Sequence, residues 1–240
     1  MSGIVDRAAV QAIVGYTFHD HDLVEAALTH PSAIEGKAIE GTYERLEFLG
    51  DSVLGAIVAT ELYQRFPGQS EGTLSLLKTS IVSGETLSAV AGKLGLGKLI
   101  AFGDSELGSD SRGMHSALEN VFEAIVGALY LDGGAEAARA FVMRELGPLM
   151  TLDAPQRLAP PKSRLQEICQ GERHSTVEYK LVGQEGPAHR PTFTSVVLIN
   201  GARKGRGTGS SKKESESNAA RDALARMGYQ VEFGEAGSEG

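Results

Sequence analysis

The chain has 240 residues, of which 41% are hydrophobic and 6% aromatic, with no Trp, one Cys and a formal net charge of -8. This length allows one large domain or two modest ones, and the apolar content excludes a wholly disordered chain. The single cysteine excludes an intramolecular disulfide, and no run approaches the ~18 apolar residues that a membrane-spanning helix needs. We expect a cytoplasmic protein without a signal peptide, because no basic segment followed by an apolar core opens the sequence.

The charge is divided unevenly along the chain. Residues 1–150 carry 10 Lys and Arg against 20 Asp and Glu, a net of -10, whereas residues 151–230 carry 13 against 8, a net of +5. The overall negative charge argues against a nucleic-acid partner when it is taken alone. The asymmetry instead favours two domains with different tasks, one acidic and one basic.

Apolar residues recur at helical spacing through the first 150 residues, and the breaks fall at clusters of Gly, Pro and Ser. No segment in this part alternates convincingly as a strand does. The pattern therefore predicts an all-α domain over 1–150. Its helices are expected over 5–14, 22–29, 43–65, 72–80, 84–94, 115–131 and 135–150.

The pattern changes after "TLDAPQRLAPP", a proline-rich stretch without periodicity, and we assign 151–160 to a linker. Beyond it a helix, three extended segments and a second helix follow one another. This α-β-β-β-α order predicts a small α+β domain over 161–230, and an acidic flexible tail over 231–240.

Three apolar stripes should form the core of this second domain. The first helix presents Leu165, Ile168 and Cys169 on one side, at helical spacing. The first strand alternates and presents Val177, Tyr179 and Leu181 on one face. The last helix presents a stripe made of Ala219, Ala220, Ala223, Leu224 and Met227.

An acidic row interrupts the apolar helix "YERLEFLGDSVLG" (43–55). Glu44, Glu47 and Asp51 stand at offsets of three and four, so they share one helix face. Like charges at this spacing destabilise an exposed helix by a few tenths of a kcal/mol per pair, roughly. A solvated face is the plain interpretation. A divalent cation would explain the row better, because Mg²⁺ prefers hard oxygen ligands.

A second helix, "HSALENVFEAIVGALYLDGG", carries a related pattern. Asn120 and Glu123 are three residues apart and share a face, and Gly127 would let another helix approach closely. If the two helices face each other, Glu47 and Asp51 could converge with Asn120 and Glu123 on one site. The sequence permits this convergence without demonstrating it.

Both motifs resemble those of the ribonuclease III family of bacterial type, and so does "ALTHPS" (27–32). Members of that family join an all-helical nuclease domain to a C-terminal double-stranded-RNA-binding domain, so the resemblance covers nearly the whole chain. It implies an endoribonuclease that works on double-stranded RNA as a homodimer, with Mg²⁺ as cofactor and Mn²⁺ as a substitute. It further implies staggered cuts with 5′-phosphate and 3′-hydroxyl ends, in the processing of rRNA precursors and mRNA.

The resemblance also implies roles for individual residues. Glu44 matches a further acidic position of the catalytic signature. Phe48 matches an aromatic that packs across the dimer interface, and Glu71 a position linked to the cleavage region of the dimer. The metal ligands and main catalytic carboxylates, by motif position, would be Glu47, Asp51 and Glu123, with Asn120 as a fourth ligand.

Asn120 departs from the family, which usually has Asp at this position. The amide oxygen can still hold a metal or water, but it is neutral and cannot act as a base. We therefore expect weaker Mg²⁺ binding than with Asp. Two alternatives stay open: a double-stranded-RNA-binding regulator with little or no cleavage, and an acidic scaffold whose carboxylates are structural.

A basic motif, "GTGSSKKESESNAARDAL", forms the second specific signal. Lys212 and Lys213 lie at a helix start, where the macrodipole disfavours cations, and a role toward phosphates would explain them. For the two lysines taken alone, solubilising side chains are the plainer interpretation. The whole motif resembles the double-stranded-RNA-binding domain. That resemblance implies that Lys212 and Lys213 span phosphates and that two further segments enter minor grooves. These segments contribute Ser163, Gln166 and Gln170 to one groove, and Pro187, Ala188 and His189 to the other.

Overall fold

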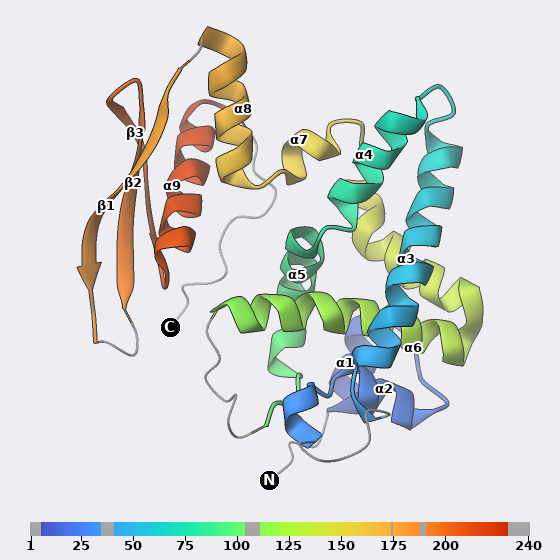
Figure 1. The fold of residues 1–240 in the computed structure, drawn as a ribbon. Helices are drawn as coiled ribbons and strands as arrows, with labels where there is room; N and C mark the ends of the chain where they lie inside the picture. Colours follow the sequence, from blue (N-terminus) through green and yellow to red (C-terminus); the bar gives the residue numbers. More distant parts are fainter. Residues whose placement is uncertain (1–5, 35–40, 104–110, 174, 188–190, 230–240) are drawn as a thin grey trace. The chain divides into compact units, whose positions relative to one another are not determined.

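The computed structural model describes residues 6–34, 41–103, 111–173, 175–187 and 191–229. The chain divides into two compact units, Met1–Ala154 and Pro155–Gly240. The first unit is helical and the second combines a sheet with helices, which confirms the predicted fold class (Figure 1). Within the described ranges, no helix is long and apolar enough to cross a membrane.

Four helices of the first unit begin where short polar side chains cap them. Asp6, Asp20, Ser70 and Ser83 each accept a hydrogen bond from a backbone N–H of the first turn. Short 3₁₀ turns join some of the helices. In chain order the helices are α1 (Arg7–Val14), α2 (His21–Ala27), α3 (Glu44–Arg65), α4 (Glu71–Ile81), α5 (Gly84–Lys93) and α6 (Ser111–Leu146).

The long helix α6 is broken at Gly134, whose φ of 73° lies in the left-handed region. The break separates two helical halves, which explains why the sequence predicted one helix over 115–131 and another over 135–150. Both halves pack against α3: Gly127 of the first half lies against the backbone of Leu46, and Arg139 of the second half pairs with Glu61.

Two glycines allow α3 and α6 to cross closely. A β-carbon at Gly50 would collide with the backbone carbonyl of Glu123, and one at Gly127 would collide with the backbone carbonyl of Leu46. Each helix thus meets the other's backbone directly at this point. The expectation that Gly127 admits a second helix is confirmed.

The second unit contains an antiparallel sheet in the order β1-β2-β3 with two longer helices packed on it (Figure 1). The β2–β3 hairpin turns at Asn200 and Gly201, both with positive φ, as a two-residue primed turn requires. A short helix, α7 (Ala154–Leu158), lies in the segment that the sequence assigns to the linker. The other elements are α8 (Pro161–Arg173), β1 (Val177–Glu185), β2 (Thr192–Ile199), β3 (Ala202–Gly209) and α9 (Lys212–Arg226).

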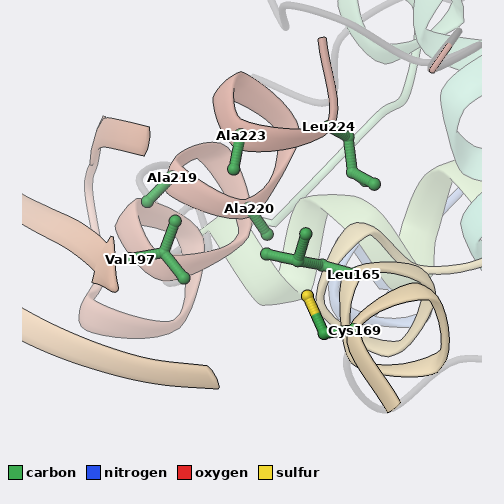
Figure 2. Packing of buried hydrophobic residues seen from close by; sticks show 7 residues of the cluster. All are labelled: Leu165, Cys169, Val197, Ala219, Ala220, Ala223 and Leu224. Atoms are coloured by element: carbon green, nitrogen blue, oxygen red, sulfur yellow. The ribbon is translucent and has the colours of Figure 1, made fainter. Parts of the chain in front are cut away.

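The core of the second unit lies between α8, α9 and the sheet. Figure 2 shows Leu165 and Cys169 of α8 beside the small side chains of α9. The predicted stripes of both helices are largely confirmed. The prediction that Met227 and Leu181 belong to this core was wrong. Met227 is 37% exposed at the end of α9, and Leu181 is 41% exposed on β1, just before a register shift between Leu181 and Gly183.

Glycines at every second position of β3 let this strand lie directly on α9. Side chains at Gly205 or Gly207 would collide with the backbone of α9 around Ala219, and one at Gly209 would press on Glu214. Because alternate residues of a strand share one face, these glycines form a flat strip.

Candidate functional site

The acidic row of α3 runs from the first turn of the helix toward its crossing with α6. Glu44 is the first helical residue, and its Oε2 accepts a hydrogen bond from the Thr42 hydroxyl at 3.3 Å. Glu47 is half-buried, whereas Glu44 and Asp51 are exposed. The row therefore borders the packed surface of the helix without being enclosed by it.

On α6, Glu123 stands opposite Gly50 and is only 9% exposed. Asn120, one turn earlier, is half-buried. The two motif helices do face each other, and the crossing at Gly50 brings Glu47 and Asp51 toward Glu123.

The carboxylates at this crossing perturb one another. Burial raises the pKa of Glu123 to about 8, with further contributions from the charges of Asp51, Glu119 and Glu47. Burial likewise raises the pKa of Glu47, followed by the charges of Glu44, Glu119 and Asp51. The carboxylates that act on one another form one group, which we call the acidic cluster: Glu44, Glu47 and Asp51 of α3 with Glu119 and Glu123 of α6.

Glu119 belongs to this cluster although the sequence motifs did not single it out. Its charge acts on Glu47 of one helix and on Glu123 of the other. The signal was present in the sequence, because residues four apart share a helix face and Glu119 precedes Glu123 by four. The sequence analysis considered only the three-residue spacing of Asn120 and Glu123, and it therefore assigned Asn120 to the site without Glu119.

The chemistry of this donor set fits a hard divalent cation, since it offers carboxylate and amide oxygens and excess negative charge. The positions of these side chains, in contrast, do not form a complete metal site. Within the described residues, no three His, Cys, Asp or Glu side chains converge into a group that could hold a metal ion as they stand. Rotation of the flexible Glu side chains would have to complete such a site.

Two further predicted residues lie outside the cluster. Phe48 is 81% exposed on α3. Glu71 is exposed at the first position of α4, where its Oε1 accepts a hydrogen bond from the Ser75 hydroxyl at 2.6 Å. The charges that act on Glu47 and Glu123 come from α3 and α6, so this chain does not bring Glu71 into the acidic cluster.

Four of the described residues expected to contact RNA lie on α8 or directly after β1 in the second unit. On α8, Ser163 and Gln170 are exposed and Gln166 is half-buried. Pro187, which follows β1, is exposed, whereas Ala188 and His189 lie outside the described residues.

Lys212 and Lys213 are the first two residues of α9, and both are exposed. Hydrogen bonds of the capping residues hold the first turn of α9 in place. Ser211 accepts a hydrogen bond from the Glu214 N–H at 3.1 Å, and Glu214 Oε2 accepts one from the Ser210 N–H at 2.7 Å. Two lysines on a fixed helix start form a surface suited to phosphate groups.

Comparisons with known proteins agree with both units. The family profile described as "Ribonuclease-III-like" matches residues 20–149, and the one described as "Double-stranded RNA binding motif" matches residues 161–227. The chain is 42% identical to ribonuclease 3 of Anaplasma phagocytophilum, over 90% of each protein. It is 44% identical to ribonuclease 3 of Symbiobacterium thermophilum, over 91% of this chain and 93% of that protein.

Solved structures agree as well. The nuclease domain of ribonuclease III from Campylobacter jejuni superposes with a TM-score of 0.54 at 32% identity, and the match covers 60% of this chain and 96% of that one. A second structure of that domain, which concerns flexibility in a region involved in dimer formation, has a TM-score of 0.53 at 33% identity. It covers 58% of this chain and 95% of the other. This chain therefore belongs to the ribonuclease III family, as an endoribonuclease with a helical nuclease domain and a double-stranded-RNA-binding domain.

Proposed function

We propose that the protein hydrolyses phosphodiester bonds of double-stranded RNA with Mg²⁺ held between α3 and α6, and that Mn²⁺ can substitute. One observation carries this proposal. The close crossing at Gly50 and Gly127 brings the backbone turn of α3 that carries Glu47 and Asp51 against the turn of α6 that carries Glu123, in a chain of the ribonuclease III family. Carboxylates gathered in this way repel one another, and a divalent cation would offset that repulsion.

Glu47, Asp51 and Glu123 would hold the ion through carboxylate oxygens, and Asn120 through its amide oxygen. When bound, Mg²⁺ supplies a Lewis acid that activates water and stabilises charge on the leaving oxygen. Burial and its acidic neighbours raise the pKa of Glu123 to about 8, so this carboxyl group would have to lose its proton in order to hold the ion. Asn120 can orient a ligand but cannot accept a proton. Glu44 would add negative charge at the entrance, where it is exposed.

The protein would act as a homodimer through the exposed face of α3. Phe48 is 81% and Tyr63 73% exposed on that helix, and Leu76 of α4 is 55% exposed. Large exposed apolar side chains of this kind favour an interface with another protein. Two protomers would supply two sites, one for each strand, and Glu71 would lie in the cleavage region that the dimer forms. The expected products have staggered 5′-phosphate and 3′-hydroxyl ends.

The RNA-binding unit would grip the duplex for an acidic nuclease domain that cannot do so well itself. We place the nuclease domain at 1–150, the linker at 151–160, the RNA-binding domain at 161–230 and the tail at 231–240. Tethering raises the local concentration of RNA at the nuclease. Recognition would follow the shape of A-form RNA, with α8 and the Pro187 region at minor grooves and the lysines of α9 at phosphates. The substrates would include rRNA precursors and mRNA in the cytoplasm.

A substrate comparison tests this function. Purified full-length protein is incubated with a perfect RNA duplex, with each single strand alone and with a DNA duplex of the same sequence, in Mg²⁺ or in EDTA. We expect Mg²⁺-dependent cleavage of the RNA duplex alone, with staggered ends on sequencing. Equal cleavage of single strands, or cleavage that persists in EDTA, would refute the proposal.

A further inference from the structure

Two buried serines link the start of α9 to the middle strand of the sheet. Ser195 of β2 and Ser215 of α9 are each 0% exposed, and their hydroxyl oxygens lie 2.7 Å apart. The Ser215 hydroxyl also donates a hydrogen bond to the backbone carbonyl of Lys212, at 2.9 Å. Because a hydroxyl has a single hydrogen, Ser215 accepts the bond that Ser195 donates. The two bonds form a chain from β2 through Ser215 to Lys212, the first residue of the helix.

Gly207 of β3 lets α9 lie close enough to the sheet for this contact. It pairs with Ser195 across the β2–β3 ladder, and a β-carbon there would collide with the backbone of α9 at Ser215 and Ala219. Residues that stand opposite each other in adjacent strands share one face of the sheet, so Ser195 points toward α9 as the bond requires. The start of the helix is therefore held on the sheet by a polar contact beside an apolar core.

A role in stability alone does not account well for this pair. Replacing two bonded hydroxyls by apolar groups of the same shape is often nearly neutral, so a stable core has little need of them. The start of α9 supplies a better reason. Helix ends fray, and the exposed charges of Lys212 and Lys213 are disfavoured by the helix dipole at this end. A bond to the carbonyl of Lys212 opposes fraying of the turn that carries both lysines.

The same bond connects two segments that contact RNA in the proposed function. Ser195 lies in the first half of β2, the strand that follows the segment of Pro187. That segment is assigned to a minor groove, and the lysines of α9 are assigned to phosphates. The bond between Ser195 and Ser215 therefore helps to set the spacing of the two contacts, on which recognition of the A-form shape depends.

We propose that Ser195 and Ser215 are positioning residues for RNA binding, and that their hydrogen bond holds the first turn of α9 so that Lys212 and Lys213 meet the phosphates of the duplex. This inference rests on the proposed function of the two lysines. Both serines are buried, so they act through the backbone of the turn. Removal of either hydroxyl should let the turn fray and should weaken binding of RNA.

Duplex binding by single and double variants separates positioning from stability. The full chain is titrated against an RNA duplex of about 16 base pairs, the span of one such domain, and anisotropy is measured in EDTA at several salt concentrations. Ser215→Ala should raise the Kd about fivefold, the effect of one net hydrogen bond, and reduce the slope of log Kd against log salt.

The double variant, Ser195→Ala with Ser215→Ala, should melt at a higher temperature than Ser215→Ala, because no buried hydroxyl is left without a partner. Its affinity for the duplex should nevertheless stay as low as that of Ser215→Ala. Recovery of the affinity together with the melting temperature would show that the pair serves stability only, and would overturn the proposal.

A double-mutant cycle with the lysines locates the effect. Ser215→Ala should weaken binding about fivefold in the wild type, but less than about twofold in a chain that carries Lys212→Ala and Lys213→Ala. An equal loss in both backgrounds would overturn positioning. If the lysine variant binds like the wild type, the proposed phosphate contact fails and the positioning role fails with it. If the lysine variant binds weakly while Ser215→Ala matches the wild type, positioning alone is overturned.

Hydrogen exchange measures the order of the turn directly. The Ser215 N–H donates to the Ser211 carbonyl at 3.0 Å, and it should exchange faster in Ser195→Ala while later turns of α9 stay protected. Thr194→Val is the matched control, because it removes a hydroxyl at the neighbouring position of β2, on the opposite face of the sheet. The control should change neither exchange nor affinity. Unchanged exchange in Ser195→Ala would contradict the anchoring of α9.

Discussion

At the scale of single residues, Glu123 has the most unusual environment of the acidic site. It is 9% exposed, it faces the backbone of α3 at Gly50, and acidic neighbours surround it. The motif predicted its place on the site-facing side of the helix. Its burial could not be predicted, because it depends on how closely another helix approaches.

The raised pKa of Glu123 gives the metal-free protein a definite pH dependence. Because burial and neighbouring charges lift this pKa from 4.5 to about 8, the folded state holds a proton that the unfolded state has lost between these values. The contribution of this group to the free energy of unfolding therefore falls as the pH rises through that window. Melting curves of the wild type and Glu123→Gln should diverge with rising pH, with the wild type losing more. If the melting temperatures of the two proteins changed equally with pH, the raised pKa of Glu123 would be contradicted.

Asp132 shows how a polar residue can serve the fold at a distance from any site. Its carboxylate accepts hydrogen bonds from the N–H groups of His19 and Asp20, at 2.9 and 2.8 Å, and from the Tyr16 hydroxyl at 2.8 Å. Burial alone would raise the pKa of Asp132, but these hydrogen bonds lower it to about 2. The residue joins α6 to the start of α2. Sequence spacing could not reveal this, because its partners lie more than a hundred positions away.

At the scale of secondary structure, helices were predictable and their closest contacts were not. Helical periodicity predicted the helices of the first unit to within a few residues, except at the extended start of α6. Gly127 signalled a close approach, whereas Gly50 looks like a weak point inside a helix until its partner backbone is known. The glycines of β3 are explained in the same way, because a side chain at any of them would collide with the facing stretch of α9.

Replacing Gly50 by Ala should separate the motif helices. The new β-carbon would overlap the carbonyl of Glu123, and both groups belong to rigid backbone, so we expect a loss of about 1–3 kcal/mol in the free energy of unfolding. Gly72→Ala is the matched control, because only the Ser70 hydroxyl lies near that position, at 4.0 Å. The control should gain about 0.5–1 kcal/mol from helix propensity. Equal stability of the two variants in urea titrations would refute the close crossing.

The lysines at the start of α9 should determine the salt dependence of RNA binding. Lys212→Ala combined with Lys213→Ala should weaken duplex binding and reduce the slope of log Kd against log salt by about one to two units. Lys180→Ala removes an exposed lysine of β1 that pairs with Glu178, and it serves as the control. Binding is measured by fluorescence anisotropy at several salt concentrations in EDTA. An unchanged slope in the double variant would show that the phosphates are held elsewhere.

At the scale of the whole molecule, the distribution of charge along the sequence already distinguishes the two units. The acidic part coincides with the helical nuclease unit and the basic part with the RNA-binding unit. The family resemblance predicted both folds because its motifs are long and specific. The sequence alone leaves open whether the protein cleaves RNA or only binds it. The effect of the neutral side chain of Asn120 on metal binding depends on which side chains surround it, and the sequence does not show these.

The exposed face of α3 should form the dimer. Phe48→Asp would bury an unpaired carboxylate at that interface, so we expect a shift from dimer to monomer in sedimentation equilibrium. Val182→Asp adds the same charge at an exposed apolar position of β1, 58% exposed, and should leave the dimer intact. A wild-type chain that sediments as a monomer would contradict the proposed assembly.

Cleavage of duplex RNA by the wild type and by Asp51→Asn, over a series of Mg²⁺ concentrations, tests the central claim most directly. Glu136→Gln is the matched control, since it removes an exposed acidic charge away from the crossing of α3 and α6. We predict Mg²⁺-dependent cleavage by the wild type and the control, and a loss of at least about 100-fold in Asp51→Asn with duplex binding retained. Equal rates in all three proteins would contradict the metal site. Duplex binding without cleavage at every Mg²⁺ concentration would instead indicate an RNA-binding regulator.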